Sequence, residues 1–138
     1  MYKEKFEEFR GKISEIISKN EHIAARHQLS AIELKDRRKL KKNEFVSTFE
    51  DFSTPANSLK DLFADEIVCK EVFDWVVNRD GEYPESDWLI SELMPYRTGF
   101  GFNLRDERID CNGVEVVLHR TDENSFGFIV KTMYPVKL

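Results

Sequence analysis

The sequence has few of the residues that mark several common classes of protein. Its two cysteines, Cys69 and Cys111, are too few for a disulfide framework or a cysteine-rich zinc site. No apolar run approaches the roughly 20 residues that a membrane-spanning helix needs. The N-terminal residues alternate charged and aromatic side chains, unlike a signal peptide. We therefore expect a soluble domain with reduced thiols and no membrane insertion; a single disulfide stays open if the protein works outside the cell.

Motifs for several kinds of chemistry are also missing. The three histidines, His22, His27 and His119, do not have metal-ligand spacing with the cysteines, and there is no Asp-x-Asp calcium loop. Gly99-x-Gly101 is too short to indicate a phosphate-binding loop, and no Gly-x-Ser-x-Gly motif is present. The sequence therefore predicts neither a metal nor another cofactor.

The charged residues that are present are unevenly distributed. Residues 1–42 contain twelve Lys or Arg and seven Asp or Glu, whereas residues 43–95 contain three and thirteen. Residues 96–138 contain six of each, and the total net charge is -5. A basic end on an acidic body keeps nucleic acid among the expected partners, although the acidic body weakens long-range attraction of a polyanion.

Helical patterns fill the first half of the chain. Apolar residues recur at helical spacing over 3–19, a short helix is predicted over 21–27, and Ser30 with Glu33 forms a capping box for a third, basic helix. Residues 45–52 are interpreted as an extended connection. Pro55 then indicates the start of a long apolar helix that continues to Val76 and ends before residues 80–84.

The second half of the chain has the pattern of strands. Irregular strands are predicted around residues 94–96 and 99–102, and Asn112-Gly113 predicts a type I′ hairpin between 108–111 and 114–118. The last strand is expected over 125–135. Helices followed by antiparallel strands indicate an α+β fold.

The last strand carries polar residues just before a terminating proline. Because side chains alternate along a strand, Thr132 and Tyr134 are expected on one face, with Ile129 and Met133 in the core and Lys131 between them. A hydroxyl and a phenol on a rigid strand can orient a substrate. The alternative is a half-buried strand edge without a catalytic role.

A histidine with basic partners suggests a particular chemistry. If the short and third helices pack as a hairpin, His27 and the arginines Arg37 and Arg38 face one cleft. Imidazole, guanidinium, hydroxyl and phenol together form a metal-free set for phosphodiester transesterification. The alternatives are a surface histidine and a solvated basic helix, and we interpret His22 and His119 as packed residues.

Four stretches, taken in order, resemble the bacterial ribonuclease A-like toxin domain at the C-termini of CdiA-type contact-dependent growth inhibition proteins and related polymorphic toxins. They are EHIAARH (21–27), ELKDRR (33–38), STFED (47–51) followed by Ala56, and VEVVL (114–118) leading to FIVKTMYP (128–135). The resemblance implies a kidney-shaped α+β fold of N-terminal helices on a curved antiparallel sheet. Residues 1–138 would form one domain, with 1–20 as a helical extension and 21–138 as the core.

The resemblance also implies the site. The catalytic residues would be His27, Arg38 (or Arg37 if the register slips by one), Thr132 and Tyr134, and Arg37, Lys131 and Lys35 would bind the substrate. The implied function is a metal-independent endoribonuclease toxin that cleaves RNA, often tRNA, and is neutralised by a cognate immunity protein. It would enter the cytoplasm of a target bacterium from the producer cell surface, as the C-terminal domain of a larger secreted protein.

A second hypothesis comes from the acidic block at 43–95. In it the chain is a catalytically inactive, acidic relative that binds a protein, as immunity proteins and antitoxins do. Under the toxin hypothesis the same acidic flank, around Asp80, Glu82, Glu85 and Asp87, would recognise a basic surface of the immunity protein.

Overall fold

The computed structural model describes residues 2–12, 15, 45–51, 53–78, 83–122 and 127–138. In these ranges it is an α+β structure, as the sequence predicts. The helices and strands, in chain order, are α1 (Tyr2–Gly11), β1 (Phe45–Phe49), α5 (Thr54–Ala64), α6 (Glu66–Val77), β2 (Asp87–Leu93), β3 (Gly99–Asn103), β4 (Arg108–Cys111), β5 (Gly113–Arg120) and β6 (Phe128–Val136).

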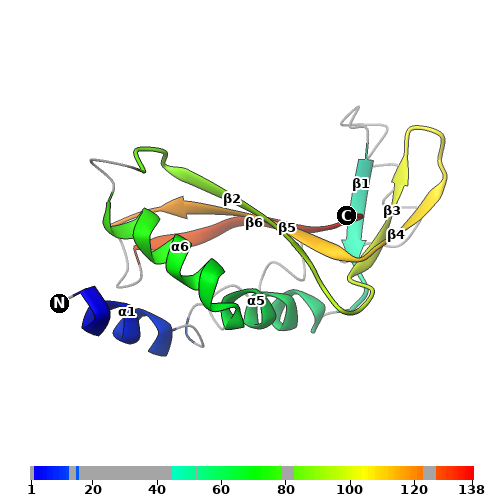
Figure 1. Cartoon of the computed structure of the whole chain (residues 1–138). Helices are drawn as coiled ribbons and strands as arrows, with labels where there is room; N and C mark the ends of the chain where they lie inside the picture. Colours follow the sequence, from blue (N-terminus) through cyan, green and yellow to red (C-terminus); the bar gives the residue numbers. More distant parts are fainter. Residues whose placement is uncertain (1, 13–14, 16–44, 52, 79–82, 123–126) are drawn as a thin grey trace.

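The strands divide into two antiparallel sheets of three strands. Strands β2, β5 and β6 form a long, twisted sheet in the order β2-β5-β6, and the shorter strands form a second sheet in the order β1-β3-β4. Figure 1 shows the helices α1, α6 and α5 along one side of the long sheet, with the short sheet at one end of it. We call β2-β5-β6 the long sheet and β1-β3-β4 the short sheet.

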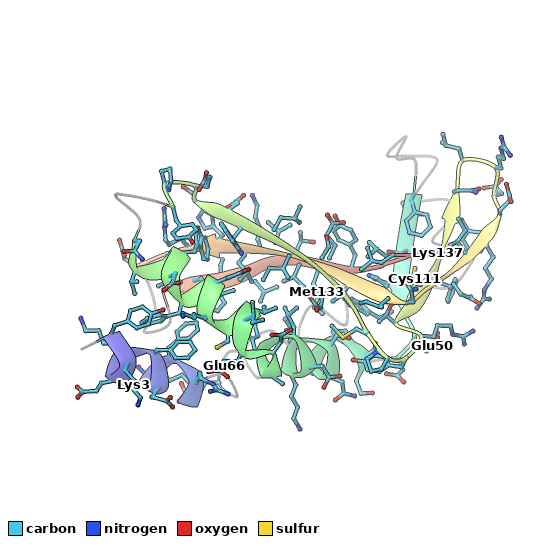
Figure 2. The ribbon with its side chains drawn as sticks, in the orientation of Figure 1. Lys3, Glu50, Glu66, Cys111, Met133 and Lys137 are labelled. Atoms are coloured by element: carbon cyan, nitrogen blue, oxygen red, sulfur yellow. The ribbon has the colours of Figure 1, made fainter. Side chains whose placement is uncertain are left out.

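The main core lies between the helices and the long sheet. Strand β5 supplies Val114, Val116 and Leu118, and β6 supplies Met133 (Figure 2); all four are fully buried. Side chains alternate along a strand. The immediate neighbours of these four residues along β5 and β6 therefore lie on the opposite face of the sheet, turned away from the helices. We call this opposite face of the long sheet the outer face. The helices fill the core with Leu59, Leu62, Phe63, Val72, Phe73 and Trp75.

The long apolar helix predicted from Pro55 to Val76 is wrong in one respect, because the chain breaks it at Asp65. This residue is extended, with φ −72° and ψ 114°, and its side chain accepts a hydrogen bond from the Ile67 amide at 2.9 Å. An aspartate satisfies the free amides at a helix start, so it favours such a cap over a position inside a helix. The result is two helices, α5 and α6, in place of one.

Strand β1 was predicted as an extended connection, and it is a full strand of the short sheet. It pairs with β3 over Phe45–Phe49, and the Ser47 hydroxyl donates to the Pro135 carbonyl at 2.7 Å. Gly99 on β3 allows this close approach, because a Cβ there would lie 2.0 Å from the Thr48 carbonyl oxygen. These contacts attach the short sheet to the C-terminal end of β6.

The hairpin predicted at Asn112-Gly113 is wrong. Strand β4 pairs with β3 in the short sheet, whereas β5 pairs with β2 and β6 in the long sheet. A type I′ turn needs positive φ at both central residues, and among the described residues positive φ occurs at Asp106 and Gly127 alone. The Asn112 side chain instead pairs with the backbone of Leu138, accepting from its amide at 2.7 Å and donating to its carbonyl at 3.2 Å.

Candidate active site

A β-bulge shapes the strand that carries the predicted hydroxyl groups. On β5, Val117 pairs with Thr132 and the next residue, Leu118, pairs with Val130, so Lys131 is an extra residue on β6. A bulge locally increases twist and redirects side chains. The consecutive residues Lys131 and Thr132 of β6 therefore lie on the same face of the sheet, so simple alternation fails at this point.

The bulge changes which residues of β6 reach the core. Val130 is buried, whereas Ile129 is 44% exposed on the outer face, so the prediction that Ile129 lies in the core is wrong. Beyond the bulge, Met133 is buried as predicted, and Thr132 and Tyr134 lie together on the outer face, half-buried. The predicted alternation of Thr132, Met133 and Tyr134 is correct, because all three residues follow the extra residue Lys131 along β6.

Tyr134 has a carboxylate partner directly across the sheet. It pairs directly with Glu115 on β5. Burial, and then the neighbouring carboxylate of Glu115, raise the pKa of Tyr134 to about 12. The phenol therefore stays protonated at neutral pH and acts as a hydrogen-bond donor.

A second group of polar side chains lies further along the same face. Asp87 on β2 pairs directly with His119 on β5, and its two carboxylate oxygens have different partners. One lies 2.6 Å from His119 Nδ1, and the other accepts from Lys131 Nζ at 2.9 Å. The hydrogen bond from His119, followed by that from Lys131, lowers the pKa of Asp87. We call these three residues the Asp87 cluster.

The Asp87 cluster is open to solvent. The side chains of His119 and Asp87 are 43% and 42% exposed, and that of Lys131 is 57% exposed. The interpretation of His119 as a packed residue is therefore wrong. Its neighbour Leu118 enters the core, so alternation places His119 on the outer face.

The outer face thus carries groups that can hold an anion and move a proton. A lysine, a hydroxyl and a phenol can donate hydrogen bonds to a phosphate, and an imidazole nitrogen can accept or donate a proton. However, Asp87 and Glu115 offset the single charge of Lys131. A polyanionic substrate therefore needs further cations beside this face.

The predicted site residues fall into two groups. Thr132, Tyr134 and Lys131 lie on the outer face, whereas His27, Arg37, Arg38 and Lys35 lie outside the described residues. Glu115 was not predicted as a site residue, and Asp87 was predicted only as part of the acidic flank that would recognise the immunity protein. The even spacing of Glu115, Val117 and His119 along one strand was the available signal for Glu115.

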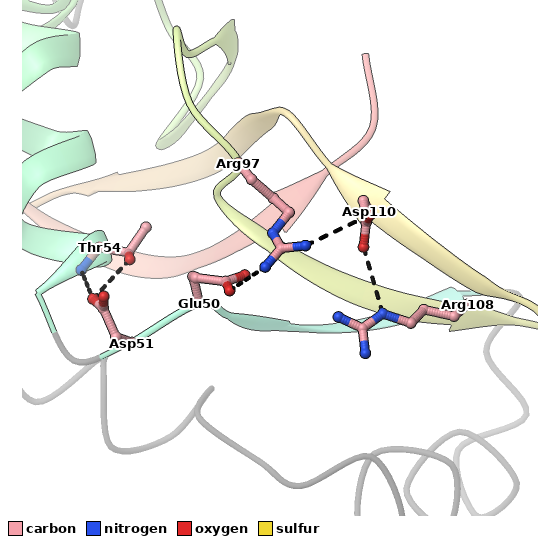
Figure 3. Close-up of polar contacts among 6 residues, drawn as sticks. All are labelled: Glu50, Asp51, Thr54, Arg97, Arg108 and Asp110. Atoms are coloured by element: carbon pink, nitrogen blue, oxygen red, sulfur yellow. Dashed lines mark hydrogen bonds and ion pairs between the residues drawn. The ribbon is translucent and has the colours of Figure 1, made fainter.

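A separate polar pocket of about 390 Å³ lies at the start of α5. Figure 3 shows Arg97 between Glu50 and Asp110, with Asp51 accepting hydrogen bonds at the start of α5 from the Thr54 amide and hydroxyl. Arg97 is thus already paired with two carboxylates, and the pocket has little free positive charge for a phosphate. We interpret it as a structural junction between the short sheet and α5. Its lining comprises Glu50, Asp51, Ser53, Thr54, Asn57, Lys60, Asp61, Tyr96 and Arg97.

Neither a metal centre nor a membrane span is found in the part of the chain that the structure describes. There, no three side chains of His, Cys, Asp or Glu are grouped as metal ligands. None of the described helices is long and apolar enough to cross a membrane. Cys69 and Cys111 are free and buried, and burial raises the pKa of each thiol to about 11.

No model of a known protein family matches the sequence, and no curated protein matches it. A solved structure does match the fold. A chain in the crystal structure of a CdiA-CT/CdiI complex from Y. kristensenii aligns with a TM-score of 0.70 and 14% sequence identity, covering 83% of this chain and 98% of that chain. At this identity the likeness shows the shared α+β fold. The resemblance to contact-dependent growth inhibition proteins is therefore supported at the level of the fold, and ribonuclease activity stays a prediction.

The contact between Glu115 and Tyr134 makes a prediction about titration. Glu115→Gln removes the negative charge and should lower the pKa of Tyr134 from about 12 part of the way towards 10.0, since burial, the larger cause, persists. The measurement is tyrosinate absorbance against pH, with Tyr134→Phe subtracted to isolate this residue. An unchanged titration in Glu115→Gln would show that the two side chains do not interact in solution.

The raised pKa also fixes the sign of a change in stability. Above pH 10.0 the unfolded chain loses the Tyr134 proton before the folded chain does, so the contribution of this group to the free energy of unfolding falls as pH rises towards 12. The contribution is fully present below pH 10.0. In Glu115→Gln the pH range over which this contribution falls should be narrower, because the pKa of Tyr134 in the folded protein is expected to be lower.

Proposed function

We propose that this chain is a metal-independent endoribonuclease toxin domain that cleaves RNA, with tRNA as its substrate class. The observation that carries the proposal is the placement of Thr132 and Tyr134, both half-buried, on the same face of β6. It is supported by the fold shared with a chain of a CdiA-CT/CdiI complex. The four stretches of resemblance, in order, supply the remaining site residues.

The proposed reaction is an internal transesterification. The 2′-oxygen of a ribose attacks the adjacent phosphorus, the bond to the 5′-oxygen breaks, and the products end in a 2′,3′-cyclic phosphate and a 5′-hydroxyl. One proton leaves the 2′-hydroxyl and another reaches the departing 5′-oxygen. His27 transfers one of them as general base or acid.

The other residues have binding roles in this reaction. Arg38, or Arg37 if the register slips by one, holds the phosphate through two hydrogen bonds and stabilises the charge that develops on it. Thr132 and the protonated phenol of Tyr134 orient the phosphate as donors. Lys131 and Lys35 contact the RNA backbone.

We further propose a cognate immunity protein and delivery as part of a larger secreted protein into the cytoplasm of a target bacterium. The acidic flank would recognise a basic surface of that inhibitor. Of its residues, Asp87 is already bonded to His119 and Lys131. An inhibitor that binds there would compete with these contacts, and its affinity should weaken with salt.

A second candidate function is an inactive, immunity-like binding module. Two observations favour it: the structure that shares the fold is a complex of two components, CdiA-CT and CdiI, and residues 43–95 carry thirteen acidic against three basic residues. Such a module would bind a basic protein surface and would not need His27, Thr132 or Tyr134.

Growth of producing cells separates the two candidates. Production of the wild-type chain without an inhibitor should arrest bacterial growth and deplete tRNA, because RNA cleavage needs no partner. The double variant Thr132→Val, Tyr134→Phe should restore growth, whereas the control Tyr2→Phe, on α1, should not. Normal growth with abundant folded wild-type protein would contradict the toxin proposal and favour the binding module.

A further inference from the structure

We propose that His119, held by Asp87, is a second proton-transfer residue of the active site and acts on the same phosphodiester as His27. This inference rests on the proposed ribonuclease function. Three features of the outer face motivate it. They are the contact between Asp87 and His119, the bulge at Lys131, and the position of His119 and Lys131 on the same face as Thr132.

The contact with Asp87 fixes the imidazole in a useful state. His119 Nδ1 lies 2.6 Å from an oxygen of Asp87, a carboxylate held ionised by its hydrogen bonds. An ionised carboxylate can only accept, so the proton of this bond is on Nδ1. Nε2 is then directed away from the carboxylate and is available to accept or donate a proton, as in other carboxylate–histidine pairs.

The position of His119 relative to the predicted donors is set by the strand register. Thr132 is opposite Val117, and His119 is two residues further along β5 on the same face, a rise of about 6.6 Å. The bulge brings Lys131 to the far oxygen of Asp87, so the ammonium and the imidazole share one carboxylate. Imidazole, ammonium and hydroxyl thus lie on the same face of the long sheet.

The proposed chemistry needs such a group, because it transfers two protons. If His27 takes the proton from the 2′-hydroxyl, a second residue must give a proton to the 5′-oxygen. If His27 gives the proton to the 5′-oxygen, the second residue must take the one from the 2′-hydroxyl. Tyr134, with a pKa of about 12, is a poor proton donor at neutral pH. An imidazole suits the task better, and His119 is the histidine that the described residues place on the outer face.

The charged surroundings of His119 come from each strand of the long sheet. Asp87 on β2 contacts the ring, Lys131 on β6 contacts the other oxygen of Asp87, and Glu115 is four residues away along β5 on the same face. The alternative role for this cluster is an exposed ion pair with a structural effect alone. Such pairs contribute little to stability, and their loss would not change a pH–rate profile.

The test is the pH dependence of kcat/KM on a fluorogenic RNA oligonucleotide. The wild-type profile should be bell-shaped, and His119→Asn should lower kcat/KM by about 100-fold or more and remove one limb of the bell. Asp87→Asn, which removes a positioning residue, should lower kcat/KM less and keep both limbs. Asp110→Asn is the matched control, since it also removes an exposed carboxylate from ion pairs and should leave the profile unchanged.

The outcomes distinguish this inference from the function on which it rests. If wild-type protein cleaves RNA and His119→Asn keeps both limbs, the inference is overturned and the proposed function stands. If folded wild-type protein does not cleave RNA, both are overturned. If His119→Asn fails to fold, NMR titration of the wild-type imidazole signals with cytidine 3′-monophosphate decides: a shift of the His119 signal supports the inference, and no shift overturns it.

Discussion

His27→Ala is expected to reduce the rate of tRNA cleavage by about 10²- to 10⁴-fold, the usual contribution of a general acid or base. The expectation follows from the position of His27 in the first of the four resembling stretches and from the proton transfer that transesterification requires. The rate should be measured in excess EDTA, so that a contaminating metal-dependent nuclease is silent.

The sequence offers a matched control five residues earlier. His22→Ala removes the same side chain from the same predicted helix but lies outside the implied site, so its cleavage rate should equal that of the wild type. Loss of activity in His22→Ala with full activity in His27→Ala would contradict the assignment of the residue. Unfolding curves of both variants establish that the comparison is between folded proteins.

Phe128→Ala is expected to lower the free energy of unfolding by about 3–5 kcal/mol, as is usual for truncation of a buried phenylalanine. Phe128 is 1% exposed, and its ring centroid lies 6.0, 6.1 and 6.4 Å from those of Phe9, Phe63 and Trp75. Truncation would leave a cavity where α1, α5 and α6 meet β6. Urea denaturation measures the loss.

The neighbouring residue provides the control and tests the bulge. Ile129 is 44% exposed on the outer face, so Ile129→Ala should change the free energy of unfolding by about 0.5 kcal/mol or less, as is usual for surface positions. Without the extra residue at Lys131, alternation from Met133 would bury Ile129. A loss of several kcal/mol in Ile129→Ala would therefore contradict the register of β6.

Fold class and local patterns were predictable from the sequence, because they depend on neighbouring residues. Pro55 indicates the start of α5, and the alternation around Met133 places Thr132 and Tyr134 on one face. The break at Asp65 was missed, because the apolar pattern on both sides masks a single capping residue. Asn112-Gly113 was misassigned, because pairing with Leu138 overrides its local preference for a turn.

The positions of site residues were predictable only where alternation within a single strand determines the face on which they lie. The bulge at Lys131 has no signal in the sequence, since Ile129 and Val130 are both apolar and either fits a core position. Asp87 was missed as a partner of His119, because cross-strand contacts depend on a register that composition does not set. The outer-face position of His119 could have been inferred from the apolar alternation of Val114, Val116 and Leu118.

The most direct test of the central claim is the chemistry of the ends left when purified protein is incubated with tRNA in excess EDTA. Transesterification predicts a 2′,3′-cyclic phosphate and a 5′-hydroxyl, and no cut where a single 2′-deoxynucleotide replaces the nucleotide that supplies the attacking hydroxyl. A 5′-phosphate product, cleavage that requires a divalent metal, or intact tRNA in the presence of well-folded protein would contradict the proposed function.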